Sequence, residues 1–125
     1  MWTSEKQTYD EVLQDFKERF NGNPRARKLT KGWDRDVVLD ATDTSARRSL
    51  VIRDQTVVDV LELESIDGDA DKMVHLQAEE DVLLQIFSGR YNPATALGDG
   101  ALAVYSAERD KVKLEALAMV IWRLG

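Results

Sequence analysis

The sequence contains no cysteine and a single histidine among its 125 residues. The lack of cysteine excludes disulfides, a thiol nucleophile and zinc held by thiolates. A small domain without disulfides fits a reducing compartment, so we expect a cytoplasmic protein. The N-terminal segment lacks the basic-then-apolar pattern of a signal peptide. The longest apolar run, 116–122, is far shorter than the ~20 residues needed to cross a bilayer.

Basic residues are outnumbered, with 17 Lys and Arg against 23 Asp and Glu, which gives a net charge of −6. Binding to nucleic-acid phosphates needs a basic surplus, so we expect no nucleic-acid partner. The length is sufficient for one hydrophobic core, and we therefore expect residues 1–125 to form a single domain.

Hydrophobic periodicity predicts the element order helix, four strands, helix, strand, helix. Apolar residues recur at helical spacing up to Phe20, and Ser4 and Gln7 have capping-box spacing, which together predict a helix over about 4–20. Alternating or β-branched runs predict the strands. The predicted strands are 37–42, 47–53, 56–64, 72–78 and one around 102–104, and the later helices are 79–88 and 111–124. This order is typical of an α+β domain with a mostly antiparallel five-stranded sheet.

The stretch 88–104, SGRYNPATALGDGALAV, places several chain reversals close together. Gly89 follows a helix where a left-handed residue is preferred. Asn92-Pro93 is an N-cap followed by proline at the first helical position, which predicts a short helix over 93–97. Gly98 and Gly100 then permit a tight turn into a strand. Because so short a helix is unstable alone, it must rest on another part of the molecule.

This stretch resembles the central motif of the sterol carrier protein 2 family, the nonspecific lipid-transfer domains. Gly89-Arg90, Asn92-Pro93, Ala96 and Gly100 match without a gap, and the resemblance extends over about residues 9–122. It implies a sheet covered on one face by helices, with an apolar tunnel between the layers. It also implies a lipid ligand such as a fatty acid, a fatty acyl-CoA or a sterol, and no cofactor, metal or catalysis.

The final predicted helix has a wider apolar surface than the ~100° that a helix resting on one sheet face requires. Val112 and Ala116 belong to one apolar stripe, and Leu114 belongs to the next. The extra width fits either a core with a dimer interface or the wall of a lipid tunnel, and the two are compatible. Asp99 is either a turn residue or a polar group at the tunnel mouth. The candidate ligand-binding residues are Phe87, Tyr91, Leu97, Asp99, Leu102, Val104, Leu117, Met119 and Val120.

Three other features of the sequence are candidates for a catalytic, metal-binding or anion-binding site. Alternation places His75 on the polar face of its strand, where we expect a solvated side chain rather than a catalytic base. The acidic segment 67–71 resembles a calcium loop in composition, but its spacing fails and predicts a turn. The basic segment Arg25–Lys28 with Lys31 is expected to be a solvated loop, the alternative being contact with an anionic lipid surface or a CoA phosphate.

We therefore predict non-catalytic binding and transfer of a hydrophobic lipid in an apolar tunnel. The alternative is a structural or dimerisation module of the same fold with a closed tunnel, assisting a lipid-metabolising enzyme. Transient membrane contact and a homodimer are compatible with both. Since binding of an acyl chain depends on apolar burial, the sequence does not specify which lipid is bound.

Overall fold

The computed structural model describes residues 8–65 and 72–123, with side chains up to residue 120 of the last helix. The predicted capping residues Ser4 and Gln7 and the predicted turn at 67–71 lie outside these ranges. The elements, in chain order, are α1 (Tyr9–Asn21), α2 (Pro24–Leu29), β1 (Arg35–Ala41), β2 (Arg47–Arg53), β3 (Thr56–Leu63), β4 (Met73–Ala78), α3 (Glu80–Phe87), α4 (Pro93–Gly98), β5 (Ala103–Tyr105), the 3-10 turn η2 (Glu108–Asp110) and α5 (Lys111–Arg123).

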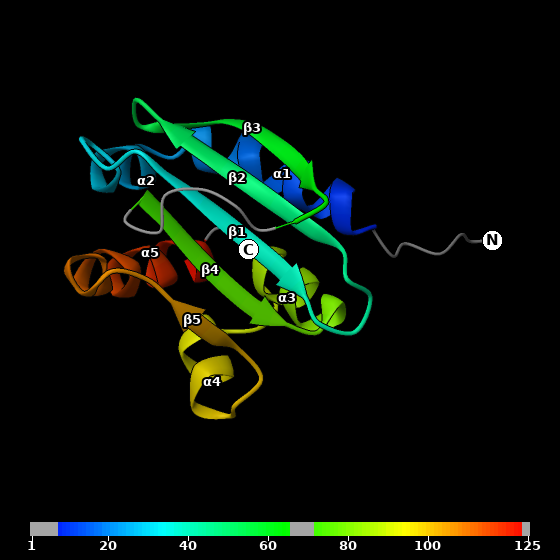
Figure 1. Ribbon diagram of the computed structural model, residues 1–125. Coiled ribbons are helices and arrows are strands. Elements are labelled where there is room, and N and C mark those ends of the chain that lie inside the picture. The colour runs from blue at the N-terminus through cyan, green and yellow to red at the C-terminus, as the bar shows by residue number, and fades with distance from the viewer. Residues whose placement is uncertain (1–7, 66–71, 124–125) are drawn as a thin grey trace.

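One five-stranded sheet runs in the order β3-β2-β1-β4-β5 (Figure 1). Neighbouring strands are antiparallel except for β1 and β4, which are parallel. The predicted α+β class and mostly antiparallel sheet are confirmed. The strand order puts β1 at the centre of the sheet, where its backbone pairs with β2 on one edge and with β4 on the other.

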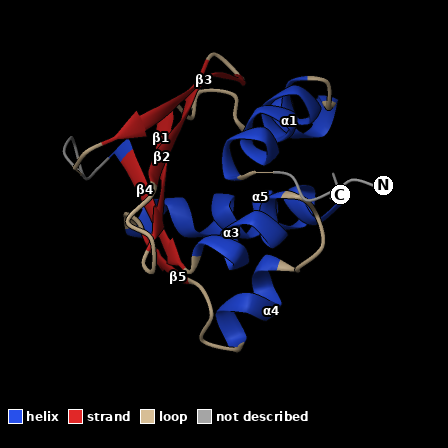
Figure 2. Ribbon diagram, turned by 90° about the vertical axis from the view of Figure 1, so that its right-hand side faces the viewer, coloured by secondary structure: helices blue, strands red, loops and turns tan. Residues whose placement is uncertain are grey.

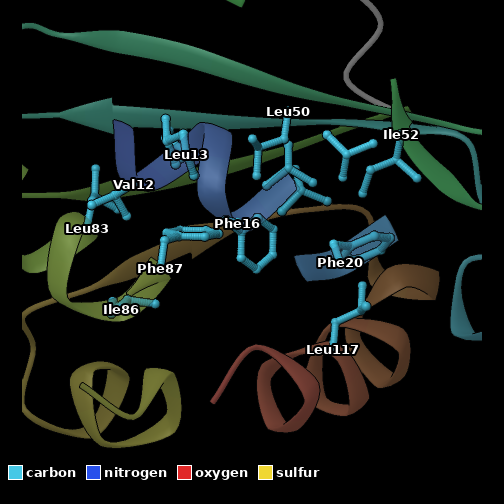
Figure 3. Packing of buried hydrophobic residues seen from close by; sticks show 14 of the residues in the cluster. Val12, Leu13, Phe16, Phe20, Leu50, Ile52, Leu83, Ile86, Phe87 and Leu117 are labelled. Atoms are coloured by element: carbon cyan, nitrogen blue, oxygen red, sulfur yellow. The ribbon is translucent and has the colours of Figure 1, made fainter. Parts of the chain in front are cut away.

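The helices cover one face of the sheet, as expected (Figure 2). The covered face presents alternate strand residues, among them Val37 of β1 and Leu50 of β2, which are directly paired across the two strands. Phe16 of α1 packs on this face and contacts the ring of Phe87 of α3 edge to face, with centroids 5.0 Å apart (Figure 3). The hydrophobic core therefore lies between the sheet and the helical layer.

The first helix begins later than its sequence predicts. Thr8 is extended and caps α1, accepting from the Glu11 backbone N–H at 3.2 Å while the Glu11 carboxylate accepts from the Thr8 N–H at 2.9 Å. The helix begins at this capping box, where the apolar stripe that it buries starts with Tyr9. At the other end, the Asn21 side chain binds both the N–H and the carbonyl of Val57, at 2.8 and 2.9 Å, and fastens α1 to β3.

The basic segment predicted as a loop is instead a helix, α2. The Asn23 side chain accepts from the backbone N–H groups of Arg25 and Ala26, at 2.9 and 3.1 Å, and Pro24 occupies the first helical position. Ala26 is fully buried, whereas Arg25 and Lys28 are exposed. The side chains of Arg25 and Lys28 therefore project into solvent from a helix and not from a loop.

The short helix α4 is confirmed, with one more residue than predicted. Asn92 accepts from the Ala94 N–H at 2.9 Å. Gly89 and Gly100 have φ values of 81° and 78°, in the left-handed region that favours glycine. Ala96 is buried, and its carbonyl accepts from the backbone N–H groups of Ala101 and Leu102, just before β5, at 2.9 and 3.1 Å. The helix packs on α5.

Candidate functional site

A cavity of about 820 Å³ lies between the inner face of the sheet and the helices α1, α3, α4 and α5. It exists because α5 packs more on α2, α3 and α4 than on the strands. The sheet supplies an aliphatic wall consisting of Val37, Leu50, Ile52, Val74, Leu76 and Val104, and Leu102, just before β5, extends it.

Aromatic rings from α1 and α3 form one side of the cavity. Phe16, Phe20 and Phe87 all line it, and the rings of Phe16 and Phe20 lie 5.9 Å apart. Leu117 points from α5 toward Phe20 and is only 5% exposed (Figure 3). This part of the cavity is deeply placed and wholly apolar.

The cavity reaches the surface between α4 and α5. Leu97 of α4 and Met119 of α5 both line it, and they are 48% and 59% exposed. Polar side chains also line the cavity, among them Asn92, Glu108 and Lys111. Lys111 and Glu108 form an exposed ion pair at 3.0 Å. The cavity therefore combines an apolar interior with a polar rim.

Six of the nine candidate ligand-binding residues line this cavity. They are Phe87, Leu97, Leu102, Val104, Leu117 and Met119. The other three are not part of the lining. The Tyr91 hydroxyl instead donates to the Asp99 carboxylate at 2.8 Å, and this bond raises the pKa of Tyr91. Val120 lines a second pocket, between α2 and α5.

Sequence reasoning missed the walls contributed by α1 and the central strands. The residues concerned carry a clear apolar pattern, which by itself indicates only a core position. What makes them a wall is the register of the sheet, since Val37 is paired with Leu50 on one side and Val74 on the other. That register joins segments far apart in the sequence, so no local signal could have identified it.

The start of α5 is fixed by a buried carboxylate. Asp110 is 1% exposed and accepts from the Trp33 indole N–H at 2.8 Å and from the Arg35 guanidinium at 3.1 Å. Burial by itself would raise the pKa of Asp110, but the hydrogen bonds from Arg35 and Trp33 together outweigh it and lower that pKa. This cluster ties the beginning of α5 to the start of β1 and so helps to set the width of the cavity.

His75 lies on the opposite, outer face of the sheet, as alternation predicts. It is not a freely solvated side chain, because its Nε2 lies 3.1 Å from the Asp40 carboxylate. Asp40 also contacts Arg47 at 3.4 Å and accepts from Gln77 at 3.3 Å. The sheet separates this polar group from the cavity.

Within residues 8–65 and 72–123 there is no group of three or more acidic or histidine side chains placed to hold a metal ion. No helix in those ranges has the length and apolar character to cross a membrane.

Neither a protein-family model nor a curated protein sequence matches the chain. Solved structures do. A crystal structure of sterol carrier protein 2 superimposes with a TM-score of 0.68 at 16% identity, over 90% of this chain and 92% of that one. Palmitated SCP2L2 from Aedes aegypti gives a TM-score of 0.58 at 16% identity, over 92% and 95% of the two chains. A double mutant of the sec-alkyl sulfatase PisA1 gives 0.63 at 18% identity, over 94% of this chain but 16% of the sulfatase. The chain therefore has the fold of the sterol carrier protein 2 domains.

Proposed function

We propose that this chain binds a hydrophobic lipid, with its acyl or sterol-like body in the cavity between the sheet and α5, and transfers it without covalent chemistry. The observation that carries the proposal is the apolar cavity of about 820 Å³. Ligand sites typically measure roughly 300–1,000 Å³. Protein cores, by contrast, contain few voids larger than a water molecule.

The energetics of the cavity suit an acyl chain. Burial of one methylene is worth ~0.8 kcal/mol, so a chain of about twelve carbons gains on the order of 10 kcal/mol. Association costs at least ~4 kcal/mol, which leaves about 6 kcal/mol and a dissociation constant on the order of tens of micromolar. An anchoring charge inside the cavity is not required, which agrees with its aliphatic and aromatic walls. The polar end of the ligand would lie at the rim, beside Asn92 and Lys111.

Similar structures support this proposal in general terms. The neighbours include sterol carrier protein 2 itself and a palmitated insect protein of the same fold. A fatty acyl chain is therefore the ligand class that we propose first for this chain.

A second candidate is a structural or dimerisation module with the cavity closed. It is favoured by the likeness to PisA1, because there the matching region is 16% of an enzyme chain. In such a module the cavity would be filled by its own side chains when the protein is assembled.

Native mass spectrometry and lipid extraction of the purified protein separate the two. A carrier is expected to retain lipid and, once delipidated, to bind a fluorescent fatty acid at micromolar concentration. Unlabelled acyl chains should displace the probe, and salt should have little effect because the contacts are apolar. Protein that carries no lipid, binds no probe and migrates as a dimer would contradict the carrier function and favour the module.

A further inference from the structure

The aromatic rings that line the cavity gather at the end that lies away from its mouth. Phe16 and Phe20 come from α1 and Phe87 comes from α3, and each is 2% exposed. The mouth lies between α4 and α5, where Leu97 and Met119 are largely exposed. Figure 2 shows α1 and α4 at opposite ends of the helical layer. The three rings therefore close the cavity on the side opposite to its opening.

Contacts among the rings hold them in place. The ring of Phe16 meets that of Phe87 edge to face, with centroids 5.0 Å apart, and that of Phe20 at 5.9 Å with the planes tilted by 54°. Edge-to-face contact is one of the arrangements that aromatic pairs prefer. Because Phe16 contacts both of the other rings, it cannot turn aside without losing both contacts.

The two helices that carry the rings are also joined to each other. The Arg19 guanidinium of α1 donates to the backbone carbonyl of Phe87 at the end of α3, with 2.9 Å between Nη2 and the oxygen. The Asn21 side chain fastens the same helix to β3 through Val57. Since α1 is tied both to α3 and to β3, the rings form a fixed boundary of the cavity.

The surroundings of the rings are apolar. Among the described residues, every side chain that α1, α3, β1 and β2 contribute to the lining is a hydrocarbon. The polar lining side chains all belong to the segment 92–115, near the mouth. A polar group buried beside the rings would lose its water without gaining a hydrogen-bond partner. An acyl chain is therefore expected to enter with its methyl end toward the rings.

We propose that Phe16, Phe20 and Phe87 are a stop for the methyl end of the bound chain, and that Phe16 sets the longest chain that the cavity accepts. The proposal rests on the lipid-carrier function and specifies its ligand as an unsubstituted acyl chain of limited length. Up to the stop, each added methylene is buried and raises the affinity about fourfold. Beyond it, a further methylene must fold back or push the polar end out of the mouth, so the affinity stops rising.

Titration of the wild type with saturated fatty acids of increasing length locates the stop. From about eight to about twenty carbons, the affinity should first rise and then level off or fall, and the break marks the length at which the tail reaches the rings. An acid at the break that carries a hydroxyl on its last carbon should bind roughly tenfold to a hundredfold less tightly. That hydroxyl would be buried among the rings without a partner.

The variant Phe16→Leu tests which residue sets the length. It removes the middle of the wall and keeps an apolar side chain, so the break should move to acids about two carbons longer. An acid of that length should bind the variant roughly tenfold more tightly than the wild type.

The matched control is Leu13→Ala, on the same helix. It removes the same number of carbon atoms from a buried side chain that lines neither pocket. It should lower the stability but leave the break at the wild-type length. A loss of packing that merely loosened α1 would move the break in both variants, whereas a stop formed by the rings moves it only in Phe16→Leu.

The variant Leu50→Phe provides a second test in the opposite direction. Leu50 of β2 lines the cavity from the sheet, so a ring there takes space from the ligand and should shorten the break by about two carbons. Thermal melting followed by circular dichroism verifies that each variant is folded.

Two results would overturn the stop. One is a wild-type affinity that keeps rising through the longest acids, and the other is a break that stays at the same length in Phe16→Leu. Either result leaves fatty-acid binding itself intact, so the carrier function would stand. Wild-type protein that binds no fatty acid of any length would contradict the carrier function, and the stop with it.

Discussion

Replacement of Leu117 by tryptophan tests the cavity directly. Leu117 lies midway along α5, is 5% exposed and points toward Phe20 of α1 (Figure 3). Because the indole replaces an isobutyl group, the space it takes from a bound chain is that of roughly two methylenes. At ~0.8 kcal/mol each, this removes about 1.6 kcal/mol of binding energy, which corresponds to a loss of affinity of roughly fifteenfold.

The stability of the same variant gives an independent reading. If the cavity is open, the indole fills existing space and the free energy of unfolding changes by less than about 1 kcal/mol. If α5 closes onto the sheet, the indole overpacks a solid core and destabilises the protein by ~1–3 kcal/mol. Urea denaturation measures this difference, and titration with a fluorescent fatty acid measures the affinity.

The matched control is Leu61→Trp, on β3. Leu61 is 43% exposed and lines neither pocket, so both affinity and stability should stay close to those of the wild type. Fatty-acid affinity that is unchanged in Leu117→Trp, together with a stability loss of ~1–3 kcal/mol, would refute the cavity as the ligand site.

Three further changes follow from the geometry. Asn92→Ala removes the cap of α4 and should lower the free energy of unfolding by about 1 kcal/mol in urea. Asp110→Asn breaks the buried pair with Arg35 and should destabilise the protein by ~3 kcal/mol at neutral pH. Because the pKa of Asp110 is lowered in the folded state, this stabilisation is present above the ordinary value of ~3.9 and is lost as the pH falls through the lower folded pKa. Wild type and variant should therefore converge in acid, and a gap that stays constant with pH would contradict the pairing. His75→Ala should leave fatty-acid binding unchanged, since His75 and the cavity lie on opposite faces of the sheet; an esterase activity that this change abolishes would disprove the non-enzymatic assignment.

Local patterns in the sequence determined the elements and much of their chemistry. Asn92-Pro93 and the glycines at 89 and 100 act through steric and capping preferences of neighbouring residues, so α4 could be predicted from a short window. Strand alternation similarly placed His75 on the outer face. The same Asn-Pro signal occurs at Asn23-Pro24, where it begins α2, although the charged residues that follow it favour a solvated loop.

Tertiary structure alone decided which of these elements meet and what lies between them. The parallel pairing of β1 and β4, and the contact of Asp110 with Trp33 and Arg35, join residues distant in the chain. No local periodicity encodes such partners. Periodicity identified Leu117 as apolar, but an apolar residue against a solid core and one lining a cavity have the same sequence pattern. The difference is set by how α5 rests on α2, α3 and α4 and stands away from the sheet. That position depends on packing across the whole domain. For this reason the cavity, and the second pocket between α2 and α5, could be found only in the folded chain.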